Sequence, residues 1–312
     1  MGDITEVRRG HPLHHLCAYQ ASFPPQHVAH HLARFGGGVV LDPFCGRGTV
    51  LLEAALAGRI VVGVDAFPVA AALSRAKLDC APRAAVLAEI DALYLLSEAP
   101  TVECPEYYHP DTWRELWNLR RLPRSPILTA LALGRLHGHS PGFFSRRTFN
   151  VNSLRPARVR AMVQKHEGNP EYDGATSPYR DVKAVLRRAA ARFVPEEGFR
   201  GRGAVHLADA RTLPLQPASV DLIITSPPFL NVVDYEDVNW LRAWFLNADQ
   251  NGLHPTVTAD RAQYAAFLRS VLGEMRRVLR PGGRCVVEVG SLKRGKYLLR
   301  DEVVALAPGA GL

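Results

Sequence analysis

The stretch GVVLDPFCGRGT at residues 38–49 decides the fold. It begins with a short apolar run that ends in an acid, which predicts a buried strand followed by a turn. Two glycines in the turn, Gly46 and Gly48, allow tight curvature and a close approach of the backbone to a ligand. The residues TVLLEAALAG that follow predict a helix that Gly58 ends. A strand, a glycine turn and a helix in this order are the start of an α/β fold.

The same alternation of strands and helices continues on both sides of a long interruption. We predict a helix around 68–78, and further strands at RIVVGVD (59–65), AVHLADA (from 204), VDLIITS (220–226) and RCVVEVG (284–290). Apolar residues at helical spacing predict two helices before the last strand, one with Val238, Leu241, Trp244 and Phe245, the other with Phe267, Val271, Met275 and Val278. Pro281-Gly282-Gly283 is expected to end the second of them. Because such apolar strands are typical of burial on both faces, the sequence predicts a doubly wound, mostly parallel sheet.

Residues 80–200 interrupt the alternation. They predict several helices and no strand, and the clearest helix is 178–194, with Pro178 in its first turn. We therefore expect a catalytic core formed by residues 1–79 and 201–312, with a helical insertion at 80–200.

The charge of the chain is concentrated in this insertion. The chain has 312 residues, of which 47% are hydrophobic and 22% charged, so it is not a disordered protein. Its net charge of +8 favours an anionic partner such as nucleic acid. Residues 112–166 contain 11 Lys/Arg and one acid, Glu115. The insertion is therefore predicted to recognise nucleic acid, the alternative being a solvated basic helical face. The expected contacts are Arg146 and Arg147 in the loop HGHSPGFFSRRTFN (137–150), with Arg155 and Arg158.

Five scattered cysteines without metal-ligand spacing indicate reduced thiols, no structural zinc and a cytoplasmic protein. The histidines near the N-terminus lack a carboxylate or Cys partner at ligand spacing, so no metal site is predicted. The N-terminal residues MGDITEVRRG contain no apolar signal region, and no apolar run approaches the length of a membrane span, so no membrane association is expected.

Acidic residues end three of the predicted strands. Asp42 argues against a phosphate ligand and for a cationic or amine-bearing one. Asp65 could bind both ribose hydroxyls of a nucleoside cofactor, as the equivalent acid does in dinucleotide-binding folds. Asp209 could accept from an adenine amino group. The alternatives are an ordinary cap at Asp65 and a loop acid at Asp209.

The segment TSPPF at 225–229 follows the strand that contains Leu222, Ile223 and Ile224. Two prolines lock the backbone and remove two N–H donors, which leaves carbonyls and the Ser226 hydroxyl as acceptors. Phe229 supplies a flat face on which a base can stack. This arrangement suits a planar ring with an exocyclic amine, although a proline-rich turn is the simpler alternative.

These motifs resemble those of the S-adenosylmethionine-dependent amino-methyltransferases, specifically the DNA N4-cytosine and N6-adenine enzymes. DPFCGRGT looks like the family's cofactor loop, and HPLHHLCAYQASFPPQHVAHHL (11–32) looks like the segment that precedes this loop. TSPPF looks like the family's catalytic loop, and this match extends to Asn231 and Tyr235. The resemblance covers roughly residues 11–79 and 203–291. It implies a Rossmann-like class I methyltransferase. The implied cofactor-binding residues are Phe23, Pro24, Asp42, Pro43, Phe44, Gly46, Gly48, Thr49, Asp65, Ala66, Asp209 and Ala210.

The resemblance also implies the reaction. Ser226, Pro227, Pro228 and Phe229 would be the catalytic residues, acting on a base flipped out of duplex DNA. The family more often has Ser at the first of these positions in N4-cytosine enzymes and Asp in N6-adenine enzymes, so Ser226 favours the N4 amine of cytosine. A companion restriction endonuclease and a bacterial or archaeal cytoplasm are expected; the oligomeric state stays open. The alternatives are N6-adenine DNA methylation, methylation of an RNA base, and a catalytically silent nucleic-acid-binding protein.

Two features depart from the family. The basic insertion lies between the second and third strands, whereas the family mostly places target recognition elsewhere. The position after the two prolines is usually Tyr, and Phe229 keeps the stacking face without the hydroxyl.

Overall fold

The structure of the chain is a computed structural model. It describes residues 10–19, 24–105, 107–138, 140–145, 161, 164–165, 178–228, 235–248, 260–289, 291–292 and 297–312. Within these ranges, no helix combines the length and apolar character needed to cross a membrane.

A five-stranded parallel sheet forms the centre of the protein, in the order β5-β2-β1-β6-β7. The chain enters at the middle strand, builds outward through β2 and β5, and then returns to the other side of β1. This confirms the predicted doubly wound, Rossmann-like sheet, and it places a topological switch point between β1 and β6. The strands are β1 (Val39–Asp42), β2 (Ile60–Asp65), β5 (Arg202–Leu207), β6 (Val220–Thr225) and β7 (Leu279–Val287).

Alternate residues of the central strands face opposite layers of helices. In β1, Val40 packs with α2 (Pro25–Arg34) and α3 (Thr49–Leu56), whereas Leu41 packs with α11 (Arg261–Val278). β6 shows the same division, because its neighbouring residues Leu222 and Ile223 belong to the two different cores. The side-chain period of two therefore buries both faces of the sheet.

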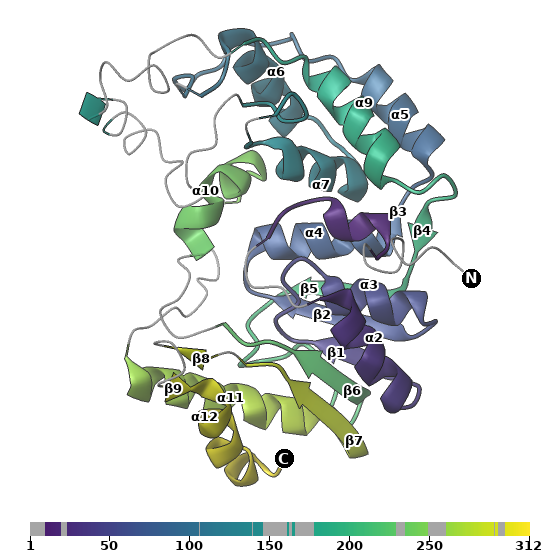
Figure 1. The fold of residues 1–312 in the computed structure, drawn as a ribbon, viewed down its shortest axis with the longest axis vertical. Coiled ribbons are helices and arrows are strands. Elements are labelled where there is room, and N and C mark those ends of the chain that lie inside the picture. The colour runs from purple at the N-terminus through teal and green to yellow at the C-terminus, as the bar shows by residue number, and fades with distance from the viewer. Residues whose placement is uncertain are drawn as a thin grey trace.

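A group of helices lies between β2 and β5 in the chain and forms the upper part of the molecule in Figure 1. These helices sit above α4, which separates them from the sheet. A two-stranded antiparallel pair, β3 with β4, joins the two ends of the segment, where only helices were expected. The elements of this region are α4 (Pro68–Leu78), β3 (Asp79–Cys80), α5 (Arg83–Ala92), α6 (Pro110–Arg121), α7 (Pro126–Arg135), α9 (Val182–Phe193) and β4 (Phe199–Arg200).

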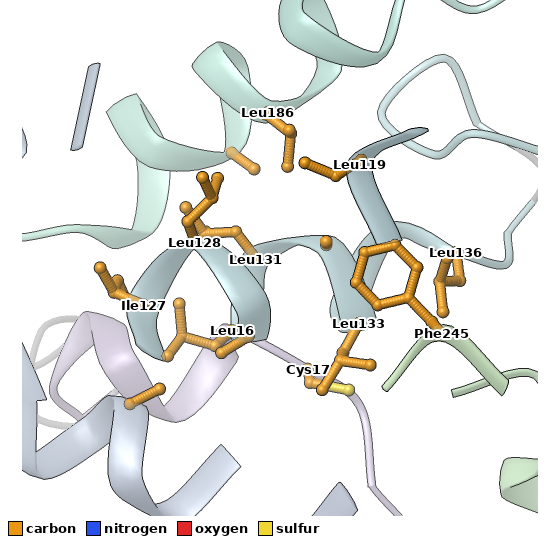
Figure 2. Packing of buried hydrophobic residues seen from close by; sticks show 14 of the residues in the cluster. Leu16, Cys17, Leu119, Ile127, Leu128, Leu131, Leu133, Leu136, Leu186 and Phe245 are labelled. Atoms are coloured by element: carbon orange, nitrogen blue, oxygen red, sulfur yellow. The ribbon is translucent and has the colours of Figure 1, made fainter. Parts of the chain in front are cut away.

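The insertion shares its hydrophobic core with parts of the chain on either side of it. Leu16 and Cys17, which follow the short 3-10 helix η1 (Pro12–His15), pack among leucines of α6, α7 and α9 (Figure 2). Phe245, the last residue of α10 (Tyr235–Phe245), is fully buried in the same cluster. The insertion is therefore continuous with the α4 side of the molecule through one apolar core.

Two predicted boundaries differ from the structure. The helix predicted at 178–194 begins at Val182, because the carboxylate of Asp181 accepts from the N–H of Ala184 and caps it, while Pro178 precedes the helix. β7 begins before the Pro-Gly-Gly turn, which lies inside the strand as an irregularity, since Val220 pairs with Leu279 but Leu222 pairs with Arg284.

The remaining elements lie near the C-terminus, at the lower end of the molecule in Figure 1. These elements are β8 (Ser291–Leu292), β9 (Tyr297–Leu298), α12 (Leu299–Leu306) and η3 (Pro308–Ala310). Both α12 and η3 contact α11.

Candidate active site

The predicted site residues meet at one edge of the sheet. Asp42 is the last residue of β1, Asp65 is the last residue of β2, and Ser226 directly follows β6. Asp209 comes two residues after β5. Because these strands are parallel, their carboxyl ends lie at the same edge, where open α/β sheets bind ligands.

Asp42 links the cofactor loop to the catalytic segment. The residue is 3% exposed, and its Oδ1 atom accepts from the Thr225 hydroxyl at 2.7 Å and from the Phe44 N–H at 3.1 Å. Burial raises the pKa of Asp42 to about 7, against the effect of the two hydrogen bonds, and the nearby charge of Asp65 adds to the rise. A buried acid with a raised pKa is stabilised in its charged form by a cation, so the site favours a cationic ligand.

The glycine loop is held in place by Asp65 and by α4. The two carboxylate oxygens of Asp65 accept from the N–H groups of Gly46 and Phe67, each at 2.9 Å. Burial raises the pKa of Asp65 to about 6, although these two hydrogen bonds oppose the rise. The Ser74 hydroxyl donates to the Gly46 carbonyl at 3.0 Å. Asp65 therefore has a structural role in the loop, and each of its oxygens keeps a second lone pair for a ribose hydroxyl.

Gly48 has a conformation and a position in which any other residue would be strained. Its φ is +75°, in the left-handed region, and it precedes α3. A Cβ atom there would lie 2.8 Å from Ser74 Oγ and 3.0 Å from Ser74 Cα. The glycine thus lets the loop pack directly against α4.

Asp209 is bound by a neighbouring cation. Arg211 donates to both carboxylate oxygens of Asp209 through its guanidinium, and to one of them through its backbone N–H at 2.8 Å. Burial alone would raise the pKa of Asp209, but the bonds to Arg211 outweigh this and lower it. An adenine amine bound here would donate to the same carboxylate that accepts from Arg211.

The segment Ser226–Pro228 is fixed through its flanking carbonyls. The Thr225 carbonyl accepts from the Glu288 N–H at 2.8 Å, and the Pro228 carbonyl accepts from the Tyr264 hydroxyl at 3.0 Å. Pro227 is buried, and Ser226 is partly exposed. Phe229, Asn231 and Phe23 lie outside the described residues, so their proposed contacts stay predictions.

The sequence reasoning missed three residues of this site: Thr225, Tyr264 and Glu288. Glu288 is the first residue after β7, and Asp42 and Asp65 are the last residues of their strands, so the same search for acids at strand ends could have identified it. It also forms an ion pair with His27 of α2, with 2.9 Å between His27 Nε2 and a Glu288 oxygen. No comparable signal marks Tyr264, since only the folded chain brings α11 to the proline turn.

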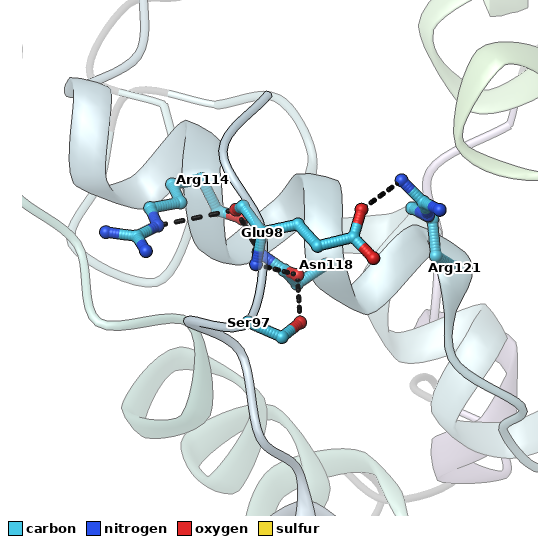
Figure 3. Close-up of polar contacts among 5 residues, drawn as sticks. All are labelled: Ser97, Glu98, Arg114, Asn118 and Arg121. Carbon is cyan, nitrogen blue, oxygen red and sulfur yellow. Dashed lines mark hydrogen bonds and ion pairs between the residues drawn. The ribbon is translucent and has the colours of Figure 1, made fainter. Parts of the chain in front are cut away.

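Several arginines of the insertion that the structure describes bind within the protein. Arg114 donates to the Leu96 carbonyl. It also donates to the Glu98 carbonyl, and Arg121 forms an ion pair with the Glu98 side chain (Figure 3). Asn118 holds the same loop, because its amide accepts from the Glu98 N–H at 3.0 Å and donates to the Glu98 carbonyl at 2.9 Å. Part of the basic charge of this segment therefore has a structural role. The four predicted DNA contacts, Arg146, Arg147, Arg155 and Arg158, lie outside the described residues.

All five cysteines are free, and three of them are buried. Across the described ranges, no group of three His, Cys, Asp or Glu side chains is placed to hold a metal ion.

The residues at the sheet edge fit the cofactor that the sequence motifs imply. The loop offers acids and backbone groups, and its one cation, Arg47, donates to the His14 carbonyl at 3.2 Å. The carboxylates at this edge would repel a phosphate. A nucleoside that carries ribose hydroxyls and a positive charge would instead be complementary to Asp42 and Asp65.

The comparisons with known proteins agree with this assignment. A family model described as an RMKL-like methyltransferase domain (UPF0020) matches residues 32–92, which contain β1, the glycine loop, β2 and α4. A search of curated proteins found no significant match. The sheet order is consistent with a class I methyltransferase fold, and the matched segment resembles a methyltransferase domain of a kind that typically uses S-adenosylmethionine.

Proposed function

We propose that the protein transfers a methyl group from S-adenosylmethionine to the exocyclic N4 amine of cytosine in double-stranded DNA. One observation carries this proposal: the Thr225 hydroxyl donates to Asp42 at 2.7 Å. That bond joins the end of the cofactor loop's strand to the Ser-Pro-Pro segment. It thereby holds the Asp42 carboxylate, which suits a cationic methyl donor, next to the Ser-Pro-Pro segment, whose oxygens suit an amine acceptor.

The cofactor, when bound, supplies an activated methyl group on a sulfonium. In the transfer, the amine nitrogen forms a bond to the methyl carbon, the carbon–sulfur bond breaks with its electron pair going to sulfur, and the amine then loses a proton to water. The protein has mainly to position the two reactants and exclude water.

The residues of the chain have separable tasks in this reaction. The carboxylate of Asp42 favours the positive charge of the donor, and Asp65 holds the glycine loop while accepting from the ribose. The Ser226 hydroxyl and the Pro227 carbonyl accept from the amine hydrogens, which favours a pyramidal nitrogen whose lone pair can attack. Phe229 stacks on the flipped base. The bond from Tyr264 to the Pro228 carbonyl keeps the acceptor groups in a fixed orientation.

Ser226→Ala tests this assignment. Loss of one preorganised polar group typically lowers the rate by about 100- to 1000-fold. We expect transfer from labelled cofactor to duplex DNA to fall by that amount, with the cofactor dissociation constant unchanged in calorimetry. Thr212→Ala is a matched control, since Thr212 is an exposed hydroxyl residue in the turn that follows β5. Full activity of Ser226→Ala would remove Ser226 from the mechanism.

The same site would serve two other acceptors, an adenine N6 amine in DNA and a base amine in RNA. The RNA alternative has independent support, because the family whose model matches includes RNA methyltransferases. Competition between duplex DNA and bulk tRNA distinguishes them: the proposal expects DNA to suppress labelling of tRNA, and the reverse result would favour RNA. Failure to bind the cofactor at all would instead support a catalytically silent nucleic-acid-binding protein.

A further inference from the structure

The helix that follows the catalytic segment ends on side chains of the insertion. α10 begins at Tyr235, seven residues after Pro228, the last described residue of the proline turn. The last carbonyls of a helix have no partner within it. In α10, Arg120 Nε donates to the Trp244 carbonyl at 2.6 Å, and Arg124 donates to the Phe245 carbonyl at 3.4 Å. Both arginines come from the α6 end of the insertion.

Aromatic contacts strengthen the same junction. The Trp113 ring of α6 stacks on the Trp244 ring, with 4.5 Å between centroids and 17° between planes. The Arg120 guanidinium lies 4.6 Å from the Trp244 ring centroid, so the indole is contacted by both α6 side chains. Stacked aromatic rings and cation–π contacts both stabilise a junction in addition to the burial of apolar surface. We call Trp113, Arg120 and Trp244 the Trp244 clamp.

Further contacts fix the last turn of α10. Phe245 is fully buried among leucines of α6, α7 and α9, as Figure 2 shows for its neighbours Leu119, Leu133 and Leu136. Arg242 donates to the Ala18 carbonyl at 3.0 Å and to the Leu133 carbonyl at 3.4 Å. The insertion therefore holds the helix that leads out of the catalytic segment.

We propose that the Trp244 clamp is a positioning element that makes the methyl-transfer step depend on the insertion. The sheet fixes the start of the catalytic segment through Thr225, and the insertion fixes α10, the next described element of the chain. A nucleic acid bound to the insertion would then act on the catalytic segment through α10, so that acceptor binding and the arrangement of the acceptor groups are coupled. This inference rests on the proposed function.

Arg120→Met tests the clamp, because it removes both the hydrogen bond to Trp244 and the cation–π contact while keeping an unbranched apolar stem. We expect kcat to fall at least tenfold, with the cofactor dissociation constant within twofold of the unmodified protein. Arg120→Lys, which keeps the charge, should recover part of the loss. Arg121→Met is the matched control, because Arg121 is the next residue of α6, is about half exposed and pairs with the exposed Glu98. The kcat of this variant should equal that of the unmodified protein.

Hydrogen exchange gives a second readout that needs no activity. Amides of α10 (235–245) should exchange faster in Arg120→Met and in Trp244→Leu than in Arg121→Met, while α3 stays protected. A kcat unchanged by Arg120→Met overturns the proposal, and so does a parallel loss of cofactor affinity, which would indicate general loosening. If the unmodified protein methylates no nucleic acid, the proposed function fails, and the exchange of α10 still decides whether the clamp holds this helix.

Discussion

Substitution of Asp42 gives a prediction of two opposite effects, because the negative charge of this side chain lowers the stability of the folded protein but favours binding of a cationic cofactor. The pKa of Asp42 is raised from 3.8 to about 7, a difference of about three pKa units that corresponds to about 4 kcal/mol. Since the folded state holds the proton more tightly than the unfolded chain does, this cost is absent below about pH 4 and fully present above about pH 7.

Asp42→Asn removes the charge and keeps an oxygen that can accept from Thr225 and Phe44. We expect the free energy of unfolding of the cofactor-free protein to rise by about 2 to 4 kcal/mol near pH 8, and by less than about 1 kcal/mol near pH 4. The assay is urea unfolding followed by circular dichroism at both pH values, comparing the variant with the unmodified protein. The same variant should bind the cofactor at least tenfold more weakly.

Asp221→Asn is the control of opposite sign. The Asp221 carboxylate accepts from the Val39 N–H at 2.7 Å and pairs with Arg280. Although burial alone would raise its pKa, these partners lower it, so its ionised form stabilises the fold above the pKa of the unfolded chain. Its substitution should destabilise the protein near pH 8. Destabilisation by Asp42→Asn near pH 8, or a gain that does not vary with pH, would refute the reasoning on Asp42.

Other substitutions separate the loop, the core and the basic segment. Asp65→Ala should weaken cofactor binding, measured by calorimetry; an unchanged dissociation constant would count against its ribose role. Gly48→Ala should lower the free energy of unfolding by about 1–3 kcal/mol, because the new Cβ meets α4 and the left-handed φ is strained; wild-type stability would contradict this. Phe245→Ala should cost about 3–5 kcal/mol in urea unfolding because the ring is fully buried. Replacing Arg146 and Arg147 with Ala should weaken DNA binding and flatten its salt dependence, and an unchanged salt slope would indicate a solvated basic face.

The sheet could be predicted from the sequence because its signals are local. The central strands β1, β2 and β6 are short, mostly apolar runs, and the glycine loop follows the first of them directly. The acids at the strand ends could also be found, since parallel strands bring their carboxyl ends to one edge. The ends of helices were predicted less accurately where two residues could each mark the start, as Pro178 and Asp181 both could for α9.

The role of the arginines could not be predicted because it depends on distant pairs. Arg120 binds the Trp244 carbonyl across 124 positions of sequence, and a count of charges cannot distinguish such a residue from one that faces nucleic acid. The bond from Tyr264 to Pro228 was missed for the same reason. Composition indicated an excess of cations in the insertion, and only the fold shows that several of them bind carbonyl groups within the protein.

The most direct test of the account is mass spectrometry of nucleosides from duplex DNA incubated with the protein and S-adenosylmethionine. The account predicts N4-methylcytosine, absent when Ser226→Ala replaces the unmodified protein. N6-methyladenine in its place would reassign the acceptor while keeping the site. DNA without any methylated nucleoside, together with a methylated base in RNA treated in the same way, would contradict the proposed function.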